Sequence, residues 1–312
     1  MTANKLTAKP FVKWAGGKYR LADQLIPFVP KKFDPLKNTY IEPMVGSGGF
    51  FFKYAPKHAY LSDINKNLIT TYNMIKYDVY DLIAHLEQYK KLHDNQSDLD
   101  KEKYFYKQRT LFNQLITRKS EELYHFNEIE IASLFIYLNK TCFNGLYREN
   151  SNGEFNVPVG KNSKGEIFLV SYDKDNLSNV NKILQQKGEK GGPLDYSVEI
   201  ACHGYEDSIN KVKEGDFVYL DPPYIPLDHL SFTKYSKDDF GKKEHEQLSN
   251  FCDSVNNKGA YFMLSNSDTK DTREIYLKEG RFSKEFSVNR SISSKAKSRV
   301  KAKELIITNY EL

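Results

Sequence analysis

The sequence places a strand, a glycine-rich loop, a helix and a second strand in direct succession. Residues 39–42 (Thr-Tyr-Ile-Glu) predict a short buried strand, residues 46–49 (Gly-Ser-Gly-Gly) a tight loop, and three phenylalanines that follow the start of a helix. The next strand, residues 59–61, ends at Ser62 and Asp63. A helix between two such strands is typical of a parallel sheet, so this segment favours an α/β fold of the doubly wound kind.

The same alternation returns in the C-terminal half. We expect a helix near residues 174–186, strands at 197–202 and 217–220, a helix at 242–255, and strands at 260–264 and 304–310. Residues 66–169 interrupt the pattern. They contain one long predicted helix (65–88), a polar loop (89–103) and helical patterns at 104–116 and 128–138. Asn152-Gly153, a strong hairpin signal, comes after these. We therefore expect a mainly parallel sheet with an inserted helical and hairpin domain.

Composition excludes several classes of protein. The 312 residues carry 46 Lys and Arg against 41 Asp and Glu, and 39% are hydrophobic, which is enough for a core and too much for a disordered chain. The 3 cysteines form no metal or disulfide pattern, and the histidines show no metal-ligand spacing. No segment has the length of a signal peptide or membrane span. We expect a soluble cytoplasmic protein without a catalytic metal or a membrane partner.

The glycine loop is a candidate nucleotide site, because open α/β sheets bind ligands where their strands end. It fits neither common phosphate motif. A dinucleotide fingerprint needs glycine where Phe51 stands, and a P-loop ending at Lys18 needs glycine where Val12 stands. Asp63, at the end of the next strand, could bind ribose hydroxyls or could cap the following helix. Both readings of Asp63 stay open.

Residues 221–224 (Asp-Pro-Pro-Tyr) are the most informative tetrapeptide in the chain. They follow the apolar strand 217–220, and two prolines without N–H groups make a rigid turn with free carbonyl groups. The Asp221 carboxylate and the Pro222 carbonyl could accept both N–H bonds of an exocyclic amine, while Tyr224 stacks on the ring that carries it. An ordinary proline-rich turn is the alternative. The buried strand before it and the second loop site favour function.

These motifs together resemble those of one family. Residues 221–224, 42–48 (Glu-Pro-Met-Val-Gly-Ser-Gly) and 13–18 (Lys-Trp-Ala-Gly-Gly-Lys) look like the motifs of the Dam family of DNA adenine N6-methyltransferases. Residues 144–148 (Asn-Gly-Leu-Tyr-Arg), 155–158 (Phe-Asn-Val-Pro) and 290–294 (Arg-Ser-Ile-Ser-Ser) extend the resemblance over nearly the whole chain. The sequence is also similar to the methylases that accompany GATC-cutting restriction enzymes.

The resemblance implies a class I, Rossmann-like sheet that transfers methyl groups from S-adenosyl-L-methionine to adenine N6 in duplex DNA at GATC. It implies a catalytic domain in residues 1–65 and 170–312 and a target recognition domain in 66–169. The implied catalytic residues are Asp221, Pro222 and Tyr224. The implied cofactor residues are Trp14, Lys18, Glu42, Gly46, Gly48, Asp63 and Asp221. The implied DNA-binding residues are Lys13, Phe143, Asn144, Leu146, Arg148, Pro158, Arg290, Ser291, Lys295, Lys297 and Arg299.

Two implied DNA contacts also have a physical argument. The planar guanidinium of Arg148 suits guanine O6 and N7, and the run of Lys and Arg with serines after Arg290 suits phosphates better than a solvated face, given the other motifs. Rival readings are an enzyme of the same fold acting on cytosine N4, on RNA or on a protein amide, and a non-catalytic DNA-binding relative. We expect a location at the nucleoid of a prokaryotic or phage-infected cell. The sequence leaves open the oligomeric state and whether a restriction endonuclease accompanies the enzyme.

Overall fold

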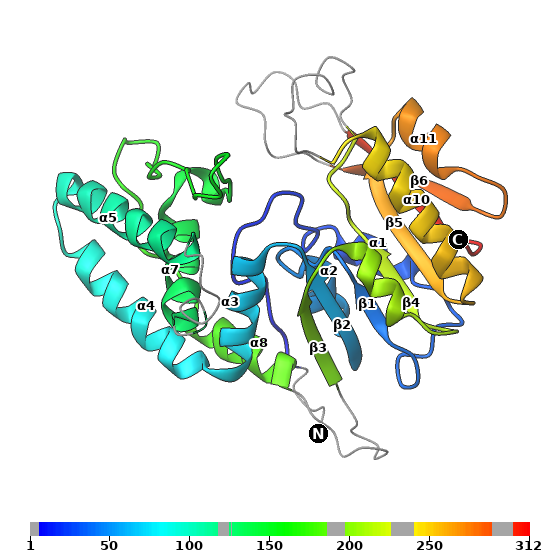
Figure 1. The fold of residues 1–312 in the computed structure, drawn as a ribbon, viewed down its shortest axis with the longest axis horizontal. Coiled ribbons are helices and arrows are strands. Elements are labelled where there is room, and N and C mark those ends of the chain that lie inside the picture. Colours follow the sequence, from blue (N-terminus) through cyan, green and yellow to red (C-terminus); the bar gives the residue numbers. More distant parts are fainter. Residues whose placement is uncertain (1–5, 118–124, 126, 186–196, 226–239, 289–301) are drawn as a thin grey trace. The chain divides into compact units, whose positions relative to one another are not determined.

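The computed structural model describes residues 6–117, 125, 127–185, 197–225, 240–288 and 302–312 (Figure 1). The chain divides into two compact units. The first unit contains residues 1–20, 46–55 and 65–202, and the second contains residues 21–45, 56–64 and 203–312. The chain therefore passes between the units several times, and each unit is built from segments that are distant in sequence.

The first unit is mainly helical, and its centre is α7 (Glu128–Thr141), whose side chains are buried from Ile131 to Asn139. This helix is apolar on all sides because α3, α4 and α5 pack around it. The described elements of this unit are α2 (Gly49–Tyr54), α3 (Lys66–Tyr77), α4 (Val79–Asp94), α5 (Asp98–Ile116), α7, the 3₁₀ turn η2 (Phe143–Gly145), α8 (Lys174–Gln185) and the strand β3 (Ser197–Cys202).

Two expectations for this region were wrong. The single helix expected over residues 65–88 is broken at Asp78, whose φ of −134° and ψ of 39° lie outside the helical region, so α3 and α4 are separate. The expected loop over residues 89–103 is only residues 95–97 long, because α5 begins directly after Ser97, whose side chain accepts the Asp100 N–H. The first turns of α5 are charged and face the solvent, so their composition resembles that of a loop.

The second unit is a twisted sheet with short helices. Its strands run in the order β2-β1-β4-β5-β7-β6, and β1 pairs in parallel with β2 and β4, and β4 with β5. Of the described strands in this unit, only β7 is reversed, pairing antiparallel with β5 and β6. The strands are β1 (Tyr40–Glu42), β2 (His58–Asp63), β4 (Phe217–Leu220), β5 (Tyr261–Ser267), β6 (Phe282–Val288) and β7 (Ala302–Thr308). The helices are α1 (Ala22–Leu25), η1 (Ile26–Phe28), η3 (Tyr205–Asn210), α10 (Lys242–Asn257) and α11 (Lys270–Tyr276).

The expected mainly parallel α/β fold is confirmed, and each central strand lies where its apolar run predicted it. All four residues of β4 are buried, and α10 packs on β5. The edge strand β6 was not expected, because its exposed side chains include Ser283, Lys284 and Glu285 and form no apolar run. Because β1, β2, β4 and β5 are parallel, they all end at the same side of the sheet, which we call its carboxyl edge (Figure 1).

Candidate active site

The glycine loop after β1 adopts a conformation that requires glycine. Gly46 and Gly48 have φ angles of 48° and 68°, in the left-handed region that L side chains rarely adopt. A Cβ at Gly46 would lie 2.7 Å from Cδ1 of Trp14, and one at Gly48 would lie 2.7 Å from the Tyr72 hydroxyl oxygen. That hydroxyl donates a 3.0 Å hydrogen bond to the Gly46 carbonyl oxygen. The backbone of the loop thus packs closely against the Trp14 and Tyr72 side chains, which leaves no room for a Cβ at Gly46 or Gly48.

Trp14 and Lys18 flank this loop within the first unit. The Trp14 indole, already close to Gly46, stacks on the Tyr147 ring with centroids 5.7 Å apart and an interplanar angle of 22°. The Lys18 backbone nitrogen lies 2.9 Å from the position of a Cβ at Gly49, and its ammonium donates to the Gly16 carbonyl at 2.7 Å. The sequence segments 14–18 and 46–49, predicted as cofactor motifs, therefore lie together.

A second set of predicted residues gathers at the end of α7. The Asn139 side chain accepts the Lys13 N–H at 2.8 Å and donates to the carbonyl oxygens of Lys13 and Gly145, each at 2.9 Å. Asn144 has a φ of 56°, which turns the chain sharply between Phe143 and Gly145. The Phe143 N–H donates to the Pro158 carbonyl at 2.9 Å. The segments 13–14, 143–146 and 158 thus form one surface.

Apolar side chains are exposed on this surface. Phe143 is 51% exposed and Leu146 is 40% exposed, although both are large hydrophobic residues. Lys140, on the preceding turn of α7, was not predicted as a site residue. Burial, followed by the charge of Lys13, lowers its pKa to about 8, so two lysines share this region. Exposed rings beside positive charge suit a nucleic-acid contact.

The hairpin that follows holds Arg148 in a defined orientation. Glu149 and Phe155 form a bridge across the hairpin, and Gly153 takes the positive φ of 74° that the Asn-Gly turn predicted. The Arg148 Nε donates to the Asn156 Oδ1 at 2.7 Å, and the Asn156 N–H donates back to the Arg148 carbonyl at 3.1 Å. The guanidinium is therefore anchored through its inner nitrogen, which directs its terminal nitrogens outward along the side chain.

In the second unit, three carboxylates mark the ends of three adjacent parallel strands. Glu42 ends β1, Asp63 ends β2 on one side, and Asp221 directly follows β4 on the other. Glu42 pairs with Leu61, and Ile41 pairs with Val218, so Asp63 and Asp221 each extend two residues beyond the level of Glu42. Glu42 is 3% exposed and accepts a 2.6 Å hydrogen bond from the Tyr40 hydroxyl. The sheet edge is thus strongly acidic.

The Asp-Pro-Pro-Tyr turn lies on this edge and is fixed by side chains of the neighbouring strands. The Tyr224 hydroxyl donates a 2.8 Å hydrogen bond to the Glu304 Oε2 of β7. The Ile225 N–H donates to the Asn266 Oδ1 at 3.1 Å, and the Ser267 hydroxyl donates to the Ile225 carbonyl oxygen. Because Pro222 and Pro223 have no N–H groups, these contacts supply the anchorage that the turn cannot make itself.

Burial and charge determine the protonation of this turn. Burial, and then the nearby carboxylates of Asp221 and Glu304, raise the pKa of Tyr224 well above its usual value. Burial, and then Asp221, likewise raise the pKa of Tyr219, whose hydroxyl lies 3.2 Å from Ser265 Oγ. Both hydroxyls therefore keep their protons at neutral pH, and Tyr224 acts as a hydrogen-bond donor toward Glu304.

Comparison with known proteins decides the family. Residues 14–289 match the family described as D12 class N6 adenine-specific DNA methyltransferase. The chain belongs to this family. It is 38% identical to the type II methyltransferase M.MjaIII of Methanocaldococcus jannaschii over 98% of this chain and 100% of that protein. It is 35% identical to the DNA adenine methylase of Haemophilus influenzae, over 97% and 94%, and 31% identical to that of Escherichia coli K12, over 96% and 94%.

This D12-class methyltransferase thus has two groups of candidate site residues, one in each unit. Arg290, Ser291, Lys295, Lys297 and Arg299 lie outside the described residues. Within the described ranges there is no cluster of three or more His, Cys, Asp or Glu side chains that could hold a metal. No helix among the described residues is long and apolar enough to cross a membrane.

Three residues that contact Tyr224 or Ile225 were missed from the sequence. Asn266 and Ser267 are the last two residues of β5, so a polar pair at the end of a buried strand was the signal. Glu304 carried a weaker signal, as the first acid after the basic run and the residue directly before the four uncharged residues that end β7. Its meaning depends on strand direction, which the sequence pattern does not give.

Proposed function

We propose that this adenine-specific DNA methyltransferase uses S-adenosyl-L-methionine to methylate adenine N6 within GATC in duplex DNA. The observation that carries the proposal is the Asp-Pro-Pro-Tyr turn at the acidic edge of the parallel sheet, anchored by Glu304 and Asn266. A carboxylate, a proline carbonyl and an aromatic ring in one rigid turn form a receptor for a planar base with an exocyclic amine.

The glycine loop and the strand ends fit the proposed cofactor. S-adenosyl-L-methionine, when bound, supplies an electrophilic methyl group on a positively charged sulfur. Glycine at positions 46 and 48 lets the loop backbone pass where a Cβ would collide with Trp14 or Tyr72, and a glycine-rich loop at the end of a parallel strand suits the close approach of a nucleoside. We propose that Trp14 and Lys18 bind beside this loop, that Asp63 binds the ribose hydroxyls, and that Glu42 and Asp221 contribute negative charge toward the sulfonium.

We propose that Asp221 and Pro222 hold the target amine. The N6 lone pair of adenine is delocalised into the ring, and acceptance of both N–H bonds by the Asp221 carboxylate and the Pro222 carbonyl draws the nitrogen toward tetrahedral geometry. Asp221 also stabilises the positive charge that develops on nitrogen. Adenine N6 is a very weak acid, so Asp221 need not remove a proton before the bond to carbon forms.

Adenine must leave the helix to reach this turn, which costs a few kcal/mol of stacking and pairing. We propose that Tyr224 offsets part of that cost by stacking on the extruded base, and that the exposed ring of Phe143 fills space in the duplex. Lys13, Asn144, Leu146 and Pro158 lie on the same surface as Phe143 and serve as further DNA contacts.

Arg148 is the proposed reader of guanine. Its anchorage on Asn156 supports this role, because a fixed guanidinium loses less side-chain entropy on binding O6 and N7 together. We propose that residues 66–169 form the target recognition domain and residues 1–65 and 170–312 the catalytic domain. The basic segment with Arg290, Ser291, Lys295, Lys297 and Arg299 is proposed to contact phosphates.

The cellular role follows from the substrate. We propose that the enzyme works on chromosomal or phage DNA in the cytoplasm. Two relatives carry the name type II methyltransferase and others the name DNA adenine methylase, so a companion restriction endonuclease is one proposed setting and a solitary methylase the other. Deletion of neighbouring nuclease genes separates these settings.

The test is transfer of radiolabelled methyl from S-adenosyl-L-methionine to a set of duplexes that differ by one base at a time around GATC. Nucleoside analysis of the product then identifies the methylated atom. We expect N6-methyladenine confined to GATC. N6-methyladenine at another site would contradict the recognition proposal alone, and N4-methylcytosine would contradict the mechanism.

A further inference from the structure

The orientation of the Tyr224 ring depends on a residue from outside its own loop. Pro222 and Pro223 fix the backbone before it but leave the side chain free to rotate about its own bonds. The hydroxyl of Tyr224 donates to Glu304 Oε2 at 2.8 Å, and this contact restrains the far end of the ring. The near end is restrained by the Ile225 N–H, which donates to Asn266. The ring is thus held at both ends.

Glu304 is well placed to act as a fixed acceptor. Its side chain is 5% exposed, and its residue pairs with Ser267 on β5 and with Phe286 on β6, so strands flank it on both sides. Because β7 runs antiparallel to β5, the first residues of β7 lie at the edge where the parallel strands end. Strand reversal is therefore what brings this carboxylate to the Asp-Pro-Pro-Tyr turn.

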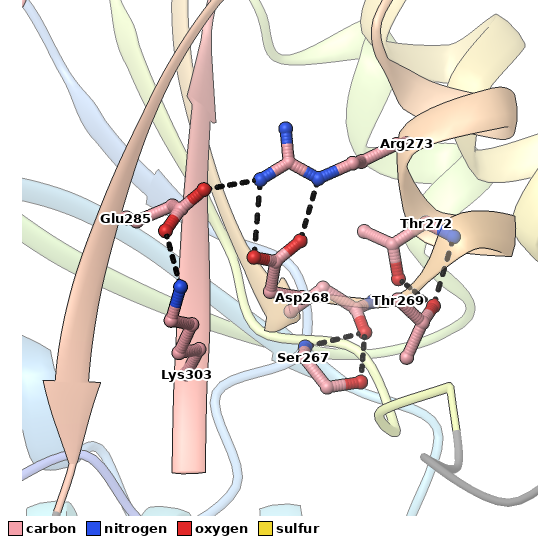
Figure 2. Close-up of polar contacts among 8 residues, drawn as sticks. Ser267, Asp268, Thr269, Thr272, Arg273, Glu285 and Lys303 are labelled. Atoms are coloured by element: carbon pink, nitrogen blue, oxygen red, sulfur yellow. Dashed lines mark hydrogen bonds and ion pairs between the residues drawn. The ribbon is translucent and has the colours of Figure 1, made fainter. Parts of the chain in front are cut away.

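A network of ion pairs holds the start of β7 in place, as Figure 2 shows. The Asp268 N–H donates to the Lys303 carbonyl at 3.1 Å, and the Lys303 ammonium lies 3.1 Å from Glu285 on β6. Arg273 on α11 bridges the two carboxylates, at 2.7 Å to Asp268 and 2.5 Å to Glu285. Lys303 directly precedes Glu304, so this network fixes the backbone from which the Glu304 side chain projects.

Packing alone does not explain a carboxylate at position 304. A buried carboxylate is costly unless it is hydrogen-bonded, and an apolar residue would fit the strand, whose next three residues, Leu305, Ile306 and Ile307, are fully buried. Among the described residues, the hydrogen-bond donor to this carboxylate is the hydroxyl of the tyrosine proposed to receive the base. The presence of a carboxylate at position 304 is explained if the reaction depends on the orientation of the Tyr224 ring.

We propose that Glu304 is a positioning residue for methyl transfer, which holds the Tyr224 ring in the plane on which the extruded adenine stacks. This inference rests on the proposed function, since it needs Tyr224 to receive the base. Glu304 acts only through the Tyr224 hydroxyl and touches neither the amine nor the methyl donor. Loss of either partner of the hydrogen bond should therefore have the same effect on the reaction.

The test is a double-mutant cycle of Tyr224→Phe and Glu304→Ala, with Glu304→Gln as the conservative variant. We expect each single variant to lower the single-turnover methylation rate about tenfold, and the double variant to be no slower than either. Glu304→Gln keeps an acceptor oxygen and should recover most of the rate. DNA affinity and the KM for S-adenosyl-L-methionine should stay unchanged, because the pair positions the base after binding.

A fluorescent base, 2-aminopurine, in place of the target adenine supplies the readout that a purely structural role would not change. Stacking of the extruded base on a fixed ring should quench its emission, and Tyr224→Phe and Glu304→Ala should alter that emission alike. The control is Glu274→Gln, which removes an exposed carboxylate of α11 that pairs with Lys270 and takes no part in the network of Arg273, Asp268, Glu285 and Lys303. We expect wild-type rate and emission from it.

Two results would overturn the inference. One is a wild-type rate for Tyr224→Phe, a variant that removes only one hydroxyl and therefore stays informative if Glu304→Ala fails to fold. The other is an additive loss in the double variant, which would show that Glu304 acts independently of the ring. Failure of the proposed function looks different, because the wild-type enzyme itself would then leave no N6-methyladenine in GATC duplexes.

Discussion

At the scale of single residues, the catalytic turn combines rigidity with charge. Pro222 and Pro223 each lack an N–H group and have a fixed φ, so this segment is rigid. Asp221 directly follows β4, whose residues are all buried, so this strand fixes the position of the Asp221 backbone. The residue's proposed role therefore depends on its charge as well as on its position.

Replacement of Asp221 tests that role. We expect Asp221→Ala to lower the methylation rate by about 10²–10³ or more, because it removes a preorganised acceptor for the developing charge. Asp221→Asn should be nearly as slow, since its amide keeps the size but has no negative charge. Binding of a cognate duplex, measured by fluorescence anisotropy, should change little for both. Retained turnover in Asp221→Asn would show that charge is not required.

At the scale of elements, the hairpin of residues 147–159 is built around backbone and side-chain contacts to α5 and α7. The Asn113 side chain on α5 accepts the Phe155 N–H at 2.8 Å and donates to the Phe155 carbonyl at 3.0 Å. The Tyr147 ring packs on Phe135 of α7, with centroids 5.1 Å apart. These contacts give the hairpin a fixed base, from which Arg148 and Asn156 extend together.

The pairing of Arg148 with Asn156 can be tested by binding. We expect Arg148→Ala to cost about 1 to 3 kcal/mol on a GATC duplex and to relax discrimination at a single base pair. Asn156→Ala should lose part of the same discrimination at the same base pair, because it frees the guanidinium to rotate. Affinities for all single-base variants of the site provide the measurement. An equal loss on cognate and random duplexes would identify Arg148 as a phosphate contact.

At the scale of the whole molecule, both units contain a buried histidine. Burial lowers the pKa of His245 to about 4, and its Nδ1 lies 2.8 Å from the Tyr276 hydroxyl. Burial also lowers the pKa of His93, which lies 2.8 Å from the Tyr137 hydroxyl. The unfolded chain binds protons at these sites below pH about 6.5, whereas the folded chain resists them.

Stability should therefore depend on pH in a defined window. The contribution of His245 is fully present above pH about 6.5 and is lost as the pH falls toward 4, by up to about 3 kcal/mol. Urea unfolding at intervals between pH 7 and pH 5 measures this slope. His245→Asn keeps an acceptor near the Tyr276 hydroxyl and does not titrate, so its slope should be smaller. Equal slopes for both proteins would assign the effect to other groups.

The sequence by itself determined the parallel strands, the glycine loop and the Asp-Pro-Pro-Tyr turn, because apolar runs, positive φ angles and missing N–H groups are local properties of residues 39–49 and 217–224. Its apolar pattern did not predict the break at Asp78 or the early start of α5 after the Ser97 cap. Only the tertiary structure joined Glu304 to Tyr224. Those residues are 80 positions apart, and they meet because β7 alone runs against β5. Strand direction is decided by how the sheet closes on its neighbours, and no local pattern contains it.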